Sequence, residues 1–198
     1  EDWIPLRSEE FFSEHGIQRV HARVMEIDPK NHRIILDEGD PYPFGALLLA
    51  TGSRPRLLSV PGANGDHVHT LRSLEDCRKI IEAAERQDVK KAVVIGASFI
   101  GMEVAASLRN RKLDVTGIAP EEIPFQHVLG DTLGTFLRNL HEEQGVDFRL
   151  GSTVEEIRED RVVLEGGSEV EADLVIVGIG VDPETSLAAK AGLEVDDG

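Results

Sequence analysis

The stretch VVIGASFIGMEVAASL at residues 93–108 constrains the fold more than any other part of the sequence. A short apolar run ends at Gly96, Gly101 follows, and a helical pattern continues. An apolar strand that turns tightly into a helix needs glycine at the turn, and a second glycine lets the helix pack closely on the strand. We therefore predict a strand at 91–95, a helix at 98–111 and a second parallel strand at 114–118.

The motif is G-x-S-x-x-G, with Ser98 where a dinucleotide-binding turn usually has its middle glycine. Serine is the smallest polar substitute, so backbone can still approach a pyrophosphate, and we expect the Ser98 hydroxyl to cap the helix. The free N–H groups at the start of the helix would then face the diphosphate. The strand, turn, helix and second strand together favour a dinucleotide site over a bare structural turn.

The acidic residue that usually binds the adenosine ribose, about 20 residues after the turn, is absent at Ala119, and Glu121 and Glu122 follow shortly after. No Lys or Arg lies between residues 113 and 137. A 2′-phosphate would meet two carboxylates and no cation, so we predict that NADH is preferred over NADPH.

Other polar candidates are weaker. Glu103 either points toward the nicotinamide or is an ordinary acid in the first turns of a helix, where it suits the helix dipole. His127 and His141 have no visible partner, and we expect both on the surface. No Ser/His/Asp nucleophile constellation and no metal-ligand spacing is visible, so we assign no catalytic residue.

The chain is acidic, with 37 Asp and Glu against 21 Lys and Arg and a net charge of −16. Such a surface repels phosphate backbones and anionic lipid, which argues against nucleic-acid and membrane partners. No run approaches ~18 apolar residues. The single Cys77 forms no internal disulfide. These features fit a cytoplasmic protein.

An internal repeat indicates two related units. Residues 33–55 align without a gap with residues 161–183, so that Gly52 meets Gly180 and Pro55 meets Pro183. A turn equivalent to Gly96 would fall before residue 1, so we expect a preceding segment with its own glycine-rich turn. Chance similarity between two short hairpins is the alternative.

The remaining elements follow from local patterns. Strands are expected at 20–28, 32–37, 147–150, 153–158, 161–165 and 172–178, and the apolar run 46–51 predicts a strand buried on both faces. Ser73 and Asp76 predict a capping box for a helix at 74–87, and a further helix is expected at 131–144 before Gly145. Residues 53–66 are the best candidate for a domain boundary.

The sequence resembles the FAD-dependent pyridine-nucleotide oxidoreductases, and within them the branch similar to ferredoxin reductases and apoptosis-inducing factor. The resemblance rests on LLLATGSRPR (47–56), HTLRSLEDC (69–77), VVIGASFIGMEVAASL (93–108), PFQHVLGDTLG (124–134) and ADLVIVGIGVDP (172–183). It implies an α/β, Rossmann-like dinucleotide-binding domain with a parallel sheet and an antiparallel β-meander, plus a partial FAD-domain segment. The implied domains are residues 1–52 (FAD), 53–180 (NAD(P)) and 181–198 (return toward the FAD domain).

The resemblance also implies the site residues. Those near the nicotinamide dinucleotide are Gly96, Ala97, Ser98, Phe99, Ile100, Gly101, Glu103 and Gly180, to which the residue argument adds Glu121. Those that approach FAD are Val24, Thr51 and Arg72. The late motif that holds the flavin and the C-terminal domain of the family are not in this sequence.

The implied function is hydride transfer from NADH to FAD, followed by electron transfer to an iron–sulfur, ferredoxin-type partner; the cofactors supply the chemistry. We expect the chain alone to bind NAD(H) without catalysing the full reaction. The alternatives are an NADH oxidase, a CoA-disulfide or nitrite reductase flavoprotein, and a non-catalytic NAD-binding module.

Overall fold

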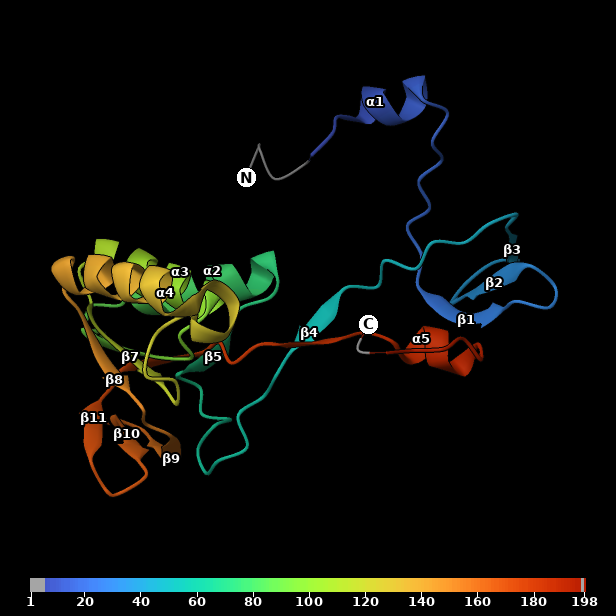
Figure 1. Cartoon of the computed structure of the whole chain (residues 1–198). Helices are drawn as coiled ribbons and strands as arrows, with labels where there is room; N and C mark the ends of the chain where they lie inside the picture. The colour runs from blue at the N-terminus through green and yellow to red at the C-terminus, as the bar shows by residue number, and fades with distance from the viewer. Residues whose placement is uncertain (1–5, 197) are drawn as a thin grey trace. The chain divides into compact units, whose positions relative to one another are not determined.

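The computed structural model describes residues 6–196 and residue 198, which form two compact units (Figure 1). The larger unit is Ser53–Pro183, and the smaller one contains the chain up to Gly52 and from Glu184 onward. Two connections therefore join the units, at 52–53 and at 183–184. The assignment of the two units to different cofactors stays a prediction.

A five-stranded parallel sheet forms the centre of the larger unit, as the sequence predicts. Its strand order is β5-β12-β6-β7-β8, and every pair of neighbours is parallel. The strands are β5 (Val68–Thr70), β12 (Leu174–Val177), β6 (Lys91–Ile95), β7 (Asp114–Ala119) and β8 (Val146–Leu150). Parallel sheets are usually buried on both faces, and both faces of this sheet are covered.

The two faces of the sheet carry different layers. Helices α2 (Leu74–Ala84), α3 (Phe99–Asn110) and α4 (Gln126–Glu143) gather on one side, and the antiparallel strands β9 (Val154–Arg158), β10 (Arg161–Leu164) and β11 (Glu169–Glu171) lie on the other (Figure 1). Alternate side chains of β6 serve the two layers: Val94 packs in the core under the helices and Val93 in the core under β9–β11. This period of two is what a buried strand requires.

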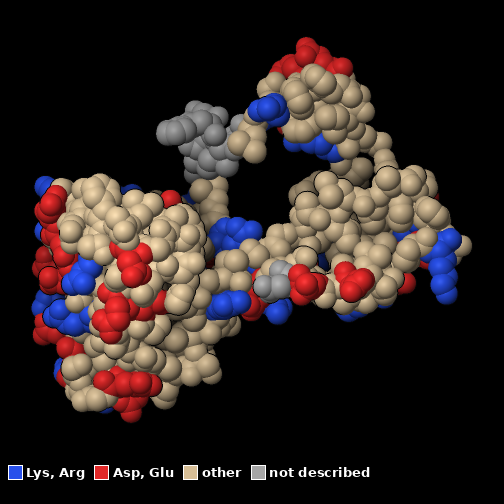
Figure 2. Space-filling model, in the orientation of Figure 1, with Lys and Arg blue, Asp and Glu red and all other residues tan. Residues whose placement is uncertain are grey.

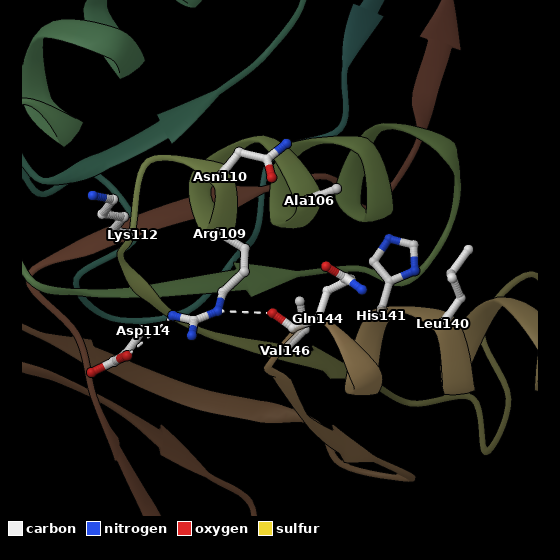
Figure 3. Close-up of a pocket in the computed structure, with 9 residues that line it drawn as sticks. All are labelled: Ala106, Arg109, Asn110, Lys112, Asp114, Leu140, His141, Gln144 and Val146. Atoms are coloured by element: carbon white, nitrogen blue, oxygen red, sulfur yellow. Dashed lines mark hydrogen bonds and ion pairs between the residues drawn. The ribbon is translucent and has the colours of Figure 1, made fainter.

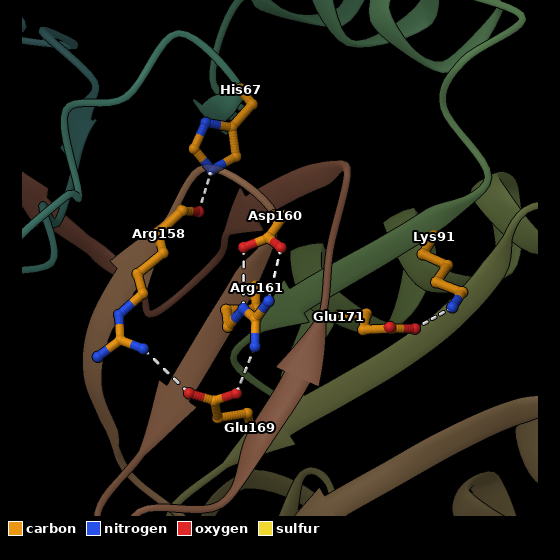
Figure 4. Close-up of polar contacts among 7 residues, drawn as sticks. All are labelled: His67, Lys91, Arg158, Asp160, Arg161, Glu169 and Glu171. Carbon is orange, nitrogen blue, oxygen red and sulfur yellow. Dashed lines mark hydrogen bonds and ion pairs between the residues drawn. The ribbon is translucent and has the colours of Figure 1, made fainter.

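Ion pairs connect side chains on the surface of the β9–β11 layer (Figure 4). The Glu169 carboxylate bridges Arg158 (3.0 Å) and Arg161 (2.6 Å), and Arg161 also pairs with Asp160 (2.7 Å). The His67 Nε2 donates to the carbonyl oxygen of Arg158 (3.0 Å), which ties the 56–67 connection to this layer. Exposed pairs contribute little singly, but the shared Glu169 carboxylate links side chains of all three strands β9, β10 and β11.

Acidic and basic side chains also lie intermingled at the end of the larger unit that carries the C-terminus of α4 (Figure 2). Arg109 pairs there with Asp114, and Arg138 pairs with Glu142. These local pairs differ from the continuous basic face that a phosphate backbone requires.

The starts of α2 and α4 can be compared with those expected from the sequence. The capping box of α2 is confirmed, because the Asp76 N–H donates to Ser73 Oγ (3.1 Å) and the Ser73 N–H donates to Asp76 Oδ2 (2.8 Å). The helix expected at 131–144 is the main part of α4, which runs from Gln126 to Glu143 and is interrupted at Gly130, whose φ of 76° and ψ of 172° lie outside helical geometry. One extra turn, 126–129, therefore precedes the main helix.

The smaller unit contains α1 (Glu9–Glu14) and a three-stranded antiparallel sheet of β1 (Val24–Asp28), β2 (Arg33–Leu36) and β3 (Tyr42–Pro43), with α5 (Ser186–Lys190) against β1. The expected strand at 46–51 does not form, and Leu48 is 89% exposed. Apolar character alone does not make a strand, because no strand among the described residues pairs with this segment. The strands β4 (Ser53–Pro55) and β13 (Val181–Pro183) pair in antiparallel fashion. The larger unit begins with β4 and ends with β13.

Candidate dinucleotide site

At the turn between β6 and α3, the backbone of three segments comes into close contact, at Gly96, Gly101 and Gly178. Gly96 has a φ of 111°, and a Cβ there would lie 2.2 Å from the carbonyl oxygen of Gly178, just past β12. A Cβ on Gly101, in the first turn of α3, would lie 2.0 Å from the carbonyl oxygen of Gly96. Only glycine fits at both positions, so α3 begins directly against the end of β6.

Ser98 is the N-cap residue of α3, with extended φ and ψ of −114° and −162°. The expectation that its hydroxyl caps the helix is wrong, because its side chain makes no capping hydrogen bond. Extended geometry permits such a bond but does not impose it. The N–H groups in the first turn of α3 are therefore not occupied by this hydroxyl, and a ligand can use them.

A hollow of about 300 Å³ opens beside this turn. It lies where β6, β7 and β12 end, at the carboxyl edge where α/β sheets bind ligands. Five of the residues expected at the site line it: Gly96, Ala97, Ser98, Glu121 and Gly180. The other lining residues are Pro120, Phe125, Gln126, His127, Val128, Gly178 and Ile179.

Four other expected residues do not line the hollow. Gly101 lies against the backbone of Gly96 and lets α3 begin close to β6. Ile100 packs against the core under the helices. The Phe99 ring meets the Phe125 ring edge-on, with centroids 5.0 Å apart. Glu103 is exposed farther along α3. Their contact with a dinucleotide stays a prediction.

The segment Phe125–Val128 was missed by the sequence reasoning. Phe125 has left-handed geometry (φ 59°), and its N–H donates to the carbonyl oxygen of Ala97 in the glycine-rich turn (2.9 Å). This hydrogen bond holds the extra helical turn 126–129 at the rim of the hollow. The segment lies within the motif PFQHVLGDTLG (124–134) that carries the family resemblance, but no site role was assigned to it.

The two histidines lie in different surroundings. His127 is exposed, as expected, but it lines the hollow. The surface assignment of His141 is wrong: its ring is partly buried, with Nδ1 2.9 Å from the carbonyl oxygen of Leu137 and Nε2 3.2 Å from that of Met102. His141 therefore joins α4 to α3.

The residues expected near FAD lie in both units. Val24 and Thr51 line one hollow of about 810 Å³ in the smaller unit, and the Thr51 hydroxyl donates to the carbonyl oxygen of Glu184 (2.6 Å). Arg72, in the larger unit, donates from Nε to the carbonyl oxygen of Ser53 (2.9 Å). Val24 and Thr51 thus line the same hollow, whereas Arg72 supports the start of β4, and the contact of all three with FAD stays a prediction.

A larger hollow, of about 590 Å³, lies at the opposite edge of the parallel sheet, where α3 and α4 end (Figure 3). Arg109 donates there from Nε to the carbonyl oxygen of Gln144 (3.0 Å) and from Nη1 to that of Leu113 (2.7 Å). Its guanidinium therefore caps two chain segments that leave helix C-termini, which is a structural role. The helix dipoles at this edge disfavour an anionic ligand.

Among the described residues, no group of His, Cys, Asp and Glu is arranged to hold a metal ion. Over the same part of the chain, the structure contains no helix with the length and apolar character of a membrane span.

The chain is similar to proteins that are already known. Residues 5–198 match the family described as pyridine nucleotide-disulphide oxidoreductase. Rhodocoxin reductase of Rhodococcus erythropolis is 37% identical over 98% of this chain and 47% of its own length. Apoptosis-inducing factor 3 of Homo sapiens is 35% identical over 98% of this chain and 32% of its own length.

Among solved structures, the ferredoxin reductase for the CYP199A2 system from Rhodopseudomonas palustris superposes with a TM-score of 0.92. It is 33% identical and covers all of this chain, which corresponds to 50% of that protein. The chain therefore spans about a third to a half of the length of these relatives.

Proposed function

The chain belongs to the pyridine nucleotide-disulphide oxidoreductase family, and we propose that it is the nicotinamide-dinucleotide-binding part of a flavoprotein reductase. In the whole protein, hydride passes from NADH to FAD, and electrons then pass to an iron–sulfur acceptor. When bound, the nicotinamide supplies the hydride and the flavin accepts it. The residues of this chain bind, orient and shield these groups.

One observation carries the proposal. The backbones of Gly96, Gly101 and Gly178 approach so closely that a Cβ on either of the first two would overlap a carbonyl oxygen. This closeness brings the start of α3 to the end of β6 and leaves a hollow at the carboxyl edge of the sheet. A pyrophosphate fits there, because free helix N–H groups and unhindered backbone face the same space.

Glu121 supports the NADH preference. It lines the hollow just beyond β7, where a carboxylate can accept hydrogen bonds from ribose hydroxyls. No Lys or Arg lines the same space. A 2′-phosphate would therefore meet a negative charge without a permanent cation beside it.

Val24 and Thr51 support a flavin site in the smaller unit, because they line one hollow together with the apolar segment 47–50. The iron–sulfur acceptor rests on the relatives, since the R. palustris structure is that of a ferredoxin reductase. Stopped-flow reduction of a ferredoxin by the full-length protein with NADH is the test of that step, and no reduction would contradict it.

The site itself is tested by calorimetric titration of this chain with NADH and NADPH. We expect NADH to bind at least ~10-fold more tightly, about 1.4 kcal/mol. The Glu121→Gln variant should lose most of that discrimination. The matched control is Glu122→Gln, because the Glu122 carboxylate lies beside Gly151, outside the hollow.

Each result has a distinct meaning. Equal binding of NADH and NADPH by the wild type would overturn the preference and leave the site. Equal effects of the two Glu variants would overturn the role of Glu121. Binding of neither nucleotide would overturn the dinucleotide site in this chain.

A further inference from the structure

We propose that His127 supplies the positive charge of the dinucleotide hollow and makes nucleotide affinity fall as the pH rises. This inference rests on the proposed function and adds a regulation of the same site. Among the described residues that line the hollow, His127 is the only one whose side chain can become cationic. Imidazole is the side chain that changes charge within the physiological pH range.

The position of His127 is fixed by its anchor. The Phe125 N–H donates to the carbonyl oxygen of Ala97, and the Val128 and Leu129 N–H groups both donate to the carbonyl oxygen of Phe125 (2.9 and 2.8 Å). The Phe99–Phe125 ring contact adds a second tie to α3. The helical turn that carries His127 is thus fastened to the turn expected to hold the pyrophosphate.

The negative charge around the hollow gives one added proton a clear effect on the affinity for an anionic ligand. The chain carries a net charge of −16, so its field opposes an anionic ligand. Glu121 is the titratable neighbour on the wall of the hollow, and Asp131 follows the turn at the start of the main part of α4. Neither adds positive charge, and the nearest residues of the α3 first turn and of 178–180 are uncharged.

Arg56 is a permanent cation close to Gly180 that does not line the hollow. A Cβ on Gly180 would lie 3.7 Å from its side chain, and its Nε pairs with Asp182 (2.8 Å). That pair offsets the Arg56 charge close to its source. A protonated His127 therefore contributes a charge that no other lining residue duplicates.

The experiment measures dissociation constants of ADP-ribose and NAD⁺ between pH 6 and pH 8.5 by calorimetry. Both ligands keep a constant pyrophosphate charge in this range, whereas a 2′-phosphate titrates near pH 6 and would confuse the result. For the wild type we expect affinity to weaken roughly fivefold as the pH rises, the size of a partly exposed contact to a charged group. ADP-ribose should show the same dependence as NAD⁺, because the contact is to the phosphates.

Two variants at the same position separate charge from structure. His127→Gln should be insensitive to pH and bind as weakly as the wild type at pH 8.5. His127→Arg should also be insensitive to pH, but bind at least as tightly as the wild type at pH 6. The control His21→Gln, an exposed histidine in the smaller unit, should follow the wild type.

A wild type with pH-independent affinity would overturn the proposal, and so would a pH dependence that persists in His127→Gln. Both results include measurable binding, so they leave the dinucleotide site intact. Absence of binding at every pH would instead overturn the proposed function, and the role of His127 with it.

Discussion

The close approach at Gly101 makes Gly101→Ala the most informative substitution. The added Cβ would lie 2.0 Å from the carbonyl oxygen of Gly96, whereas real Cβ contacts essentially never fall below 3.0 Å. The start of α3 must therefore move at least about 1 Å away from the end of β6. Val94, whose Cγ1 would be 3.5 Å away, is already in ordinary contact and does not change this estimate.

Two effects of this substitution oppose each other. Alanine in place of glycine favours the helix by about 1 kcal/mol, and overpacking in a well-packed region costs typically 1–3 kcal/mol. Because the atom in the way is backbone rather than a flexible side chain, we place the overpacking cost at the upper end. The free energy of unfolding should fall by about 1–2 kcal/mol.

The effect on nucleotide binding should be larger than the effect on stability. A 1 Å displacement moves the first-turn N–H groups away from the pyrophosphate, and we expect NADH affinity to fall about tenfold or more, because hydrogen bonds to charged groups contribute about 1.5–3 kcal/mol. Urea unfolding followed by far-ultraviolet circular dichroism measures the first quantity, and calorimetry the second.

The control for this substitution is Ser107→Ala, at an exposed position of the same helix. It also introduces alanine, so it should change stability by less than about 0.5 kcal/mol and leave NADH binding unchanged. If Gly101→Ala behaved like Ser107→Ala in both measurements, the reasoning from backbone contact would be refuted.

Two further predictions concern stability. Arg109→Met removes the donors to the carbonyl oxygens of Leu113 and Gln144. It should lower the free energy of unfolding by about 1–2 kcal/mol without changing NADH affinity. The control Arg111→Met loses an exposed pair with Glu85, and its free energy of unfolding should stay within about 0.5 kcal/mol of the wild type. Burial tends to raise the pKa of Asp76, but hydrogen bonds from Ser73 and from the Arg72 N–H outweigh it and lower that pKa. The capping contribution is therefore present above the unfolded value of about 3.9 and lost as the pH falls through the lower folded value. Asp76→Asn should cost about 1 kcal/mol at pH 7, and its difference from the wild type in urea unfolding should shrink below pH 4; a constant difference would contradict the assignment.

Local features were predictable because they depend on neighbours in the sequence. The apolar run before Gly96 predicts a strand and a turn, and the Ser73–Asp76 pair predicts a capped helix. Features that need distant partners were not. The segment 46–51 has the composition of a buried strand, but a strand also requires another backbone to pair with, and composition carries no information about that.

The missed part of the site has the same origin. Phe125 adopts left-handed geometry, which its residue type disfavours, because the carbonyl oxygen of Ala97 accepts its N–H and Phe99 packs on its ring. Tertiary contacts therefore override local preference there, and no periodicity in the sequence signals them. His127 looked like an isolated surface histidine for the same reason.

The significance of Ser98 also depends on residues that are distant in the sequence. In the sequence, the 96–101 motif has two of the usual three glycines. Counted in space, three glycines meet at the turn, because Gly178 comes from the end of β12 and its backbone lies against Gly96 and Gly101. The open space that the dinucleotide requires is therefore created partly by a strand about 80 residues away. A Gly178→Ala variant should then impair NADH binding although the 96–101 motif is intact, since its Cβ would lie 3.3 Å from the Gly101 nitrogen, tighter than nine in ten real contacts. Unchanged calorimetric affinity in that variant would show that the motif alone makes the site.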